Sequence, residues 1–170
     1  MLASDQGLKF AIVVVSTSRS YSNDQVIPEL SQWIVQQAKG EVVDALIVKD
    51  QINSIQEAII SLGEKSAQVI LVSGGTGISP DDVTPEALKP LYSRSLPGFD
   101  EGMRRYSESK TPYALVSRGV SGIFQEKLVI SLPGSPRGAV ENINFLLPLL
   151  THSVKKMAGD RTPCQKGHES

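Results

Sequence analysis

The chain has 170 residues, 40% of them hydrophobic, and its 17 lysine and arginine residues against 18 aspartate and glutamate residues give a net charge of -1. This size suits one globular domain with a sizeable core, and the balanced charge, with no basic face that carries aromatic residues, argues against nucleic-acid binding. The longest apolar runs fall far short of the roughly 20 residues of a membrane span, the opening residues lack the pattern of a signal peptide, and the single cysteine, Cys164, excludes an internal disulfide. We therefore expect a cytoplasmic protein with no membrane partner.

Strands and helices alternate along the chain, which is typical of an α/β fold whose sheet is covered by helices on both faces. In the first half the sequence predicts strands at residues 10–16, 41–48 and 69–72, and helices near residues 26–38, 55–62 and 85–92. Two of the helix starts carry capping signals. Asn53 with Gln56 fits a capping box, and Thr84 before Pro85 fits an N-cap followed by proline at the first helical position.

The second half predicts a turn at residues 96–98, a polar helix at 101–108 and three strands at 113–117, 120–124 and 128–132. The last two strands would form a hairpin, which makes the sheet mixed. Ser135 caps the final helix, with Pro136 at its first position, and Pro148 should kink or break that helix locally. We therefore divide the chain into one domain, residues 1–160, and a flexible tail, residues 161–170.

The most informative segment follows the third strand. Gly74, Gly75 and Gly77 allow a tight turn with no Cβ in the way, and successive bare amides in such a turn form a concavity that binds anions. Asp82 can supply the hard oxygen ligands that a magnesium ion on phosphates requires. The structural alternative is an ordinary loop in which Ser79 and Asp82 form a helix-capping box. Neither the Rossmann G-x-G-x-x-G pattern nor a Walker A lysine is present.

In an open sheet of this kind, ligands bind outside the carboxyl ends of the strands. The relevant loops therefore follow Ser16, Val48, Ser73 and Leu132. Their hydroxyl, carboxylate, glycine and cationic residues suit a phosphorylated ligand with its metal. These residues are Ser18, Arg19, Asp50, the run 74–82, Ser135 and Arg137.

Four motifs carry a family resemblance: SGGTG with DDVTPE, LPGF followed by GMR, LVSR with a later glycine, and LPGSP before the last helix. On these motifs the chain resembles the MoaB/MogA family of molybdenum-cofactor biosynthesis proteins over about residues 9–160. The resemblance implies a three-layer α/β/α sandwich with a mostly parallel mixed sheet, a trimer or hexamer, and molybdopterin binding, with other proteins of cofactor biosynthesis as partners. For MogA-type members it also implies transfer of AMP from Mg-ATP to the terminal phosphate of molybdopterin, with release of pyrophosphate.

The resemblance also assigns site residues. Asp50 and Asp82 match catalytic carboxylates, which would hold Mg²⁺ on ATP. Arg118 and Gly122 match a further family loop. The ligand-binding positions are Ser16, Ser18, Gly74, Gly75, Thr76, Gly77, Pro133, Gly134 and Ser135.

Two residues depart from the family pattern: Ser18 stands where aspartate is frequent, and Asp81 stands where arginine is common. Loss of the arginine removes a charge-assisted contact with the triphosphate, unless Arg19 or Arg137 replaces it. A second hypothesis is therefore a non-catalytic molybdopterin-binding protein of the MoaB type. A third is a relative of the similar domain in competence-damage proteins, which act on nucleotides.

Overall fold

The structure is a computed structural model that describes residues 7–162. The predicted tail beyond residue 162, which includes Cys164, and the opening residues 1–6 lie outside the described residues. The helices, 3₁₀ helices (η) and strands are, in chain order, β1 (Lys9–Val15), α1 (Val26–Gln36), β2 (Glu41–Val48), α2 (Ile52–Gly63), β3 (Val69–Ser73), α3 (Thr84–Leu88), η1 (Lys89–Leu91), β4 (Arg94–Ser95), α4 (Pro97–Glu108), η2 (Pro112–Val116), β5 (Ser121–Phe124), β6 (Lys127–Leu132) and α5 (Pro136–Met157).

The strands form a single mixed sheet in the order β2-β1-β3-β6-β5-β4. Strands β2, β1, β3 and β6 are parallel, whereas β5 runs antiparallel to both β6 and β4. The β5–β6 hairpin turns at Gln125 and Glu126, whose φ angles of 45° and 59° belong to a tight hairpin turn. The predicted mostly parallel mixed sheet is confirmed.

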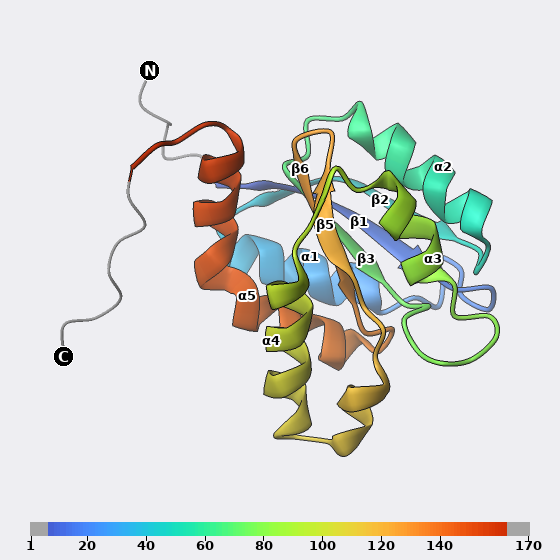
Figure 1. Cartoon of the computed structure of the whole chain (residues 1–170). Coiled ribbons are helices and arrows are strands. Elements are labelled where there is room, and N and C mark those ends of the chain that lie inside the picture. The colour runs from blue at the N-terminus through green and yellow to red at the C-terminus, as the bar shows by residue number, and fades with distance from the viewer. Residues whose placement is uncertain (1–6, 163–170) are drawn as a thin grey trace.

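Helices cover both faces of the sheet and make three layers (Figure 1). Residues of α1, α4 and α5 pack on one face of the sheet, and residues of α2 and α3 pack on the other. Strand β1 contributes to both cores, because alternate side chains of a strand point to opposite faces. Phe10, Ile12 and Val14 face α1 and α5, while Ala11, Val13 and Val15 face α2.

One predicted strand, residues 113–117, is wrong. The segment forms the 3₁₀ helix η2, in which Pro112 occupies the first turn and the Thr111 hydroxyl accepts a hydrogen bond from the backbone amide of Tyr113. The short strand β4, which the sequence did not suggest, already pairs with β5 at the outer edge of the sheet. Residues 113–117 therefore have no neighbouring strand to pair with, and the Tyr113 side chain is exposed.

Both predicted capping signals in the first half are also wrong. Helix α2 begins at Ile52 after Gln51, without a side-chain cap, and Gln56 instead donates a hydrogen bond from Nε2 to the carbonyl of Ala87 on α3. Thr84 lies inside α3, whose N-cap is Val83. In both cases the side chain bonds a carbonyl outside its own helix, that of Ala87 for Gln56 and that of Gly74 for Thr84.

The last helix is predicted more accurately. Ser135 is the N-cap of α5 and accepts a hydrogen bond from the amide of Gly138 at 3.2 Å. The helix continues through Pro148 and changes direction along its length (Figure 1), as expected for a proline that removes one backbone hydrogen bond. No helix within residues 7–162 is long and apolar enough to cross a membrane.

Candidate functional site

The candidate site lies where the parallel strands end. The chain leaves β1 toward β2 on one side and later returns to β3 on the other, so the ends of β1 and β3 form a topological switch point. The connections after β1, β2, β3 and β6 emerge on the same side of the sheet (Figure 1). The loops that the sequence indicated as ligand-binding therefore lie at the same end of the sheet.

The glycine loop after β3 lies tightly against β1. Gly74 and Gly75 have φ angles of 107° and 63°, which residues with a Cβ rarely adopt. A Cβ on Gly74 would lie 2.4 Å from the carbonyl oxygen of Val15, and one on Gly75 would lie 2.4 Å from Oγ1 of Thr84. Both glycines are therefore required by the shape of the loop.

The amides of this loop have the character of an anion site. Within the described part of the chain, none of the backbone N–H groups of residues 75–78 donates a hydrogen bond, and the same holds for Gly134 and Ser135 after β6. The two loops touch, since a Cβ on Gly134 would lie 3.3 Å from the Cα of Gly74. Unpaired amides that converge in this way bind phosphate or carboxylate oxygens.

Asp82 folds back onto its own loop. Its Oδ2 accepts a hydrogen bond from the backbone amide of Ser79 at 2.9 Å, and a Cβ on Gly77 would lie 2.7 Å from the same oxygen. Gly77 therefore makes room for the carboxylate. Half of the capping-box alternative is present in this contact, but the segment between Ser79 and Asp82 is a turn and α3 begins only at Thr84.

Asp50 follows β2, and Thr17 in the loop after β1 holds it. The Thr17 hydroxyl donates to Oδ2 of Asp50 at 2.8 Å. Strand β1 lies between β2 and β3, and a spacing of about 4.8 Å per strand separates the ends of β2 and β3 by roughly 10 Å. The loops that carry Asp50 and Asp82 thus both follow the carboxyl ends of parallel strands, one on each side of β1.

The serines after β1 order their own loop. Ser16 accepts a hydrogen bond from the amide of Arg19 at 3.2 Å, and its hydroxyl oxygen lies 3.4 Å from that of Ser18. Ser16 is half-buried and Ser18 is exposed. Both hydroxyls lie in the loop after β1, and their role in ligand binding stays a prediction.

The two cations proposed to replace the family arginine have other partners. Arg19 Nη1 lies 3.9 Å from the buried carboxylate of Asp24, and the exposed Arg137 donates from Nε to Glu141 at 2.9 Å. The Arg137 guanidinium also lowers the pKa of Glu141. In this conformation neither arginine is a free counter-charge for a triphosphate.

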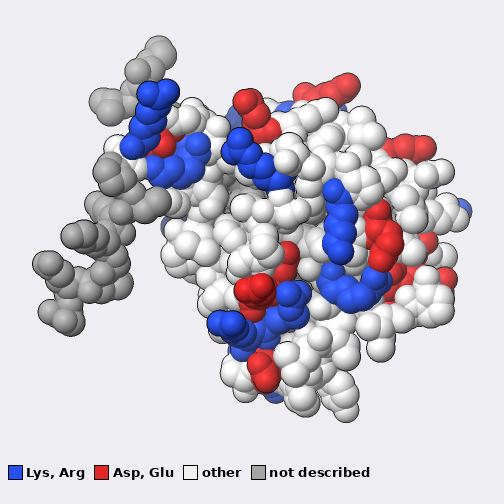
Figure 2. Space-filling view, viewed as in Figure 1, with Lys and Arg blue, Asp and Glu red and all other residues white. Residues whose placement is uncertain are grey.

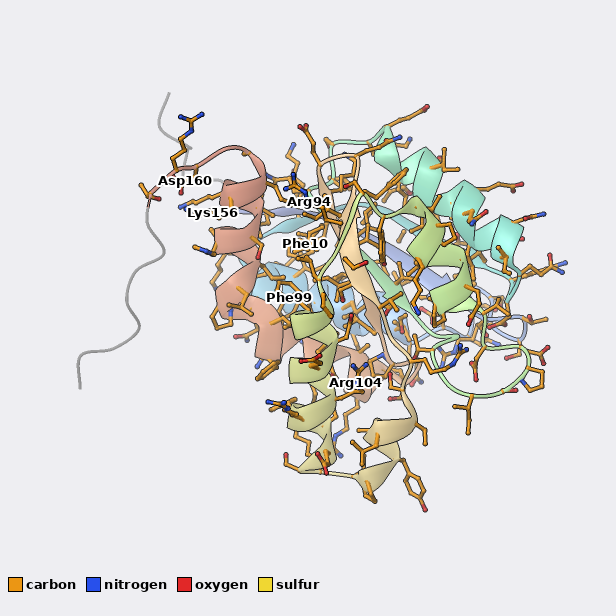
Figure 3. The ribbon with its side chains drawn as sticks, in the orientation of Figure 1. Phe10, Arg94, Phe99, Arg104, Lys156 and Asp160 are labelled. Carbon is orange, nitrogen blue, oxygen red and sulfur yellow. The ribbon has the colours of Figure 1, made fainter. Side chains whose placement is uncertain are left out.

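The loop after β6 borders a small cavity. The Ser73 hydroxyl donates to the carbonyl of Pro133 at 2.7 Å, which ties the end of β3 to this loop, whereas the hydroxyl of Ser135 caps α5. The cavity has a volume of about 50 Å³ and continues past Arg104, which extends from α4 (Figure 3), into a groove of about 530 Å³. Most of the exposed cavity wall is apolar, although polar residues lie around it, among them Asp100, Ser107, Ser117, Ser131 and Asn142.

Arg118 belongs to the LVSR motif, and the sequence did not predict the contacts of its side chain. It donates four hydrogen bonds into the loop after β3 and to Glu86 on α3. These contacts join positions more than 30 residues apart, so no local pattern predicts them. Gly122 lies away from the site, in β5, where a Cβ would lie 2.4 Å from the ring of Tyr92.

Charges of both signs are mixed over the face shown in Figure 2, without a broad basic patch. Within residues 7–162 no group of three or more histidine, cysteine, aspartate or glutamate side chains could hold a metal ion. A metal at this edge would therefore bind to the two carboxylates together with oxygen atoms from a ligand and water.

Comparison with known proteins gives the family. Residues 11–152 match the family described as "Probable molybdopterin binding domain". The chain belongs to the MoaB/MogA family of molybdenum cofactor biosynthesis proteins. Its relatives include molybdenum cofactor biosynthesis protein B of Bacillus subtilis, 32% identical over 88% of this chain and 90% of the relative. They also include molybdopterin adenylyltransferase of Haemophilus influenzae, 35% identical over 80% of this chain and 71% of the relative.

Solved structures of the MoaB/MogA family share the fold. A crystal structure of molybdenum cofactor biosynthesis protein B matches with a TM-score of 0.86 and 30% identity, over 92% of this chain and 99% of that chain. Some relatives are longer: the chain spans 20% of the gephyrin of Dictyostelium discoideum and 48% of a bifunctional molybdenum cofactor biosynthesis protein of Synechococcus elongatus. The CinA protein of Thermoplasma acidophilum, 17% identical with a TM-score of 0.60, shares the fold alone.

Proposed function

We propose that this MoaB/MogA protein adenylylates molybdopterin with Mg-ATP, giving adenylyl-molybdopterin and pyrophosphate. The observation that carries the proposal is the row of amides at residues 75–78, unpaired within the described residues and flanked by Asp82 and Asp50. Such amides bind phosphate oxygens, and carboxylates supply oxygen ligands for Mg²⁺. The name of the Haemophilus influenzae relative supports the same activity.

The reaction asks the protein for positioning and charge neutralisation rather than for a nucleophile. A phosphate oxygen of molybdopterin forms a bond to the α-phosphorus of ATP. The bond from that phosphorus to the bridging oxygen breaks, and its electron pair leaves with pyrophosphate. Because a phosphate monoester, with a second pKa of about 6, is mostly dianionic at pH 7, its attacking oxygen needs no general base. The loop amides would hold the ATP phosphates in line for this attack.

Asp50 and Asp82 fit a magnesium ion by the chemistry of their oxygens. In each carboxylate, Oδ2 accepts a hydrogen bond, whereas Oδ1 accepts none from the described residues. Magnesium on a nucleotide is typically bound by one or two carboxylates, phosphate oxygens and waters. When bound, it would neutralise negative charge on the phosphates. The contribution of the protein is to hold the two carboxylates in place through Thr17 and Ser79.

Molybdopterin is assigned to the cavity and groove beside Pro133. The mainly apolar wall of the cavity can pack against a pterin ring, and the adjoining groove supplies the volume and the polar side chains that a ligand of this size needs. The loop of Pro133 and Gly134 touches the glycine loop. A ligand in the groove can therefore direct its phosphate toward ATP. Assembly as a trimer or hexamer stays a prediction from the family.

A second candidate function is molybdopterin binding without ATP turnover. Asp81 favours it, because this exposed carboxylate lies next to Asp82, where a triphosphate would meet additional negative charge. The ion pairs of Arg19 and Arg137 also favour it, since neither cation is free to offset that charge. The two candidates differ in whether pyrophosphate is released.

The test is incubation of the purified protein with Mg-ATP and molybdopterin, with detection of adenylyl-molybdopterin and pyrophosphate. The wild type should form both. Asp82→Asn keeps an oxygen that can accept from the Ser79 amide but removes the charge, and it should reduce transfer by roughly 100-fold or more. Asp81→Asn, one residue away, is the matched control and should retain transfer. Molybdopterin binding by the wild type without pyrophosphate would support the second candidate, and full activity of Asp82→Asn would refute the role of that carboxylate.

A further inference from the structure

We propose that Arg118 is a positioning residue that holds the loop between β3 and α3 in the shape that exposes its amides to a polyphosphate. The inference rests on the proposed function, because it names the residue that prepares the same site. Arg118 lies between η2 and β5, 41 residues from Gly77 in the sequence. Arg118 also lines the groove that is assigned to molybdopterin, but its hydrogen bonds are made to the loop and to α3.

Three hydrogen bonds from Arg118 end on backbone carbonyls of one loop. The backbone amide of Arg118 donates to the carbonyl of Thr76 at 2.8 Å. In the side chain, Nε donates to the carbonyl of Gly77 at 2.7 Å, and Nη2 donates to the carbonyl of Asp82 at 2.5 Å. A single residue thus fixes the middle and the end of the loop that carries the unpaired amides.

The direction of these carbonyls decides where the amides point. In a trans peptide the C=O of one residue and the N–H of the next point in opposite directions. Because Arg118 draws the carbonyls of Thr76 and Gly77 toward itself, the N–H groups of Gly77 and Ile78 point away from it. Both of these N–H groups are unpaired among the described residues. Without Arg118 these peptide planes could rotate, and the amides would no longer be aimed at one anion.

The guanidinium itself is occupied. Its third nitrogen, Nη1, donates to Glu86 on α3 at 2.5 Å, and this contact lowers the pKa of the Glu86 carboxyl. The ion pair offsets part of the positive charge, and the planar fork directs its other two nitrogens to the loop. Arg118 therefore acts on a phosphate through the loop backbone. Lysine cannot reproduce this, since it has a single nitrogen and no rigid fork.

The experiment compares Arg118→Lys and Arg118→Gln with the wild type. Mg-ATP affinity is measured by calorimetry, and amide hydrogen exchange is measured at Ser79, Asp82 and Thr84, whose amides are hydrogen-bonded within the loop. Loss of hydrogen bonds from a charged group should weaken Mg-ATP binding by roughly 10- to 100-fold in Arg118→Gln, with a smaller loss in Arg118→Lys. Exchange should accelerate in the loop while the core of β3 stays protected. In steady-state transfer, KM for ATP should rise more than kcat falls.

Two controls separate positioning from general stability. Val154→Ala removes buried volume at the far end of α5 and should lower the thermal midpoint without changing Mg-ATP affinity. Glu86→Gln leaves the three loop carbonyls with their donors and should cost less affinity than Arg118→Gln. Wild-type affinity in Arg118→Gln, or unchanged exchange at Ser79, Asp82 and Thr84, would overturn the inference. Neither the affinity nor the exchange rate depends on turnover. A wild-type protein that binds Mg-ATP but releases no pyrophosphate would contradict the proposed adenylylation. The role of Arg118 would still be decided by the affinity and exchange measurements.

Discussion

Thr84 fastens the glycine loop at its base. Its hydroxyl donates to the carbonyl of Gly74 at 2.8 Å, and its backbone amide donates to the carbonyl of Gly75 at 3.0 Å. The side chain is fully buried. Thr84 therefore closes the loop where α3 begins, while Arg118 holds its middle and its end. A loop fastened at both places can keep unpaired amides aimed at a ligand without collapsing onto itself.

Replacing Thr84 tests this closure. Thr84→Val keeps the shape of the side chain but leaves the carbonyl of Gly74 buried without its donor, which should lower the free energy of unfolding by about 1–3 kcal/mol. Thr84→Ser retains the hydroxyl and should lose less. Urea unfolding of the three proteins gives the comparison. Equal stability of Thr84→Val and the wild type would mean that the hydroxyl contributes nothing to the loop.

Gly77 should be required for the position of Asp82 rather than for folding. In Gly77→Ala the new Cβ would collide with Oδ2 of Asp82 at 2.7 Å, so the carboxylate must move. A displacement of this size at a reacting centre can cost about 100-fold in rate. We expect transfer to fall by that order with little change in thermal midpoint.

Gly98 provides the matched control for Gly77. It lies near the start of α4, and a Cβ there would meet no atom within 4 Å. Gly98→Ala should retain transfer and gain up to about 1 kcal/mol of stability from the better helix former. Equal transfer rates for both alanine variants would contradict the steric argument.

Ser135 is expected to stabilise the structure as a helix cap. Ser135→Ala removes the acceptor for the Gly138 amide and should cost about 1 kcal/mol of unfolding free energy. Ser135→Asn retains a capping oxygen and should stay near the wild type. If both variants unfold at the same denaturant concentration, the serine does not act through the cap. Loss of molybdopterin binding in the stable asparagine variant would assign the hydroxyl a ligand role as well.

Asp100 should make stability depend on pH. Burial raises the pKa of this carboxyl, opposed by hydrogen bonds from the hydroxyl and amide of Ser121 at 2.6 and 2.9 Å and by the charge of Arg104, while Glu101 raises it further. An acid with a raised pKa binds its proton more tightly in the folded state. Stability therefore falls as the pH rises from the ordinary aspartate value of about 3.9 through the raised value.

Asp100→Asn removes this dependence, because the amide can still accept from the Ser121 backbone and donate to its hydroxyl. Relative to the wild type, the variant should gain stability as the pH rises from 4 to 7. Thermal unfolding across that range measures the difference. A difference between the two proteins that is constant with pH would rule out titration of Asp100 as its cause.

Local patterns predicted the elements whose stabilising contacts are close in sequence. Val69–Ser73 is buried throughout, as a continuous apolar run predicts for a central parallel strand. Ser135 caps α5 because its partner, Gly138, is three residues away. The prediction was wrong for residues 113–117, because a short apolar run forms a strand only where a neighbouring strand is available, and β4 already pairs with β5.

The candidate site also has residues that the sequence predicts and contacts that it does not. Its glycines could be identified from the sequence, since Gly74 and Gly75 adopt backbone angles that favour this residue. The partners of the charged residues could not. Thr17 with Asp50 and Arg118 with Gly77 are joined across 33 and 41 residues, and Arg19 is paired with Asp24 instead of facing the crevice.

The sequence by itself determined the α/β class, the buried strands, the glycine turn and the acidic residues beside it, because strand burial and turn geometry depend on neighbouring residues. Only the tertiary structure decided that Arg118 directs the loop carbonyls, that Thr84 closes the loop and that Arg19 pairs with Asp24. The physical reason is that a hydrogen bond between distant segments depends on how the sheet orders its strands. Strand order follows from packing of the whole core and not from any single stretch of the chain.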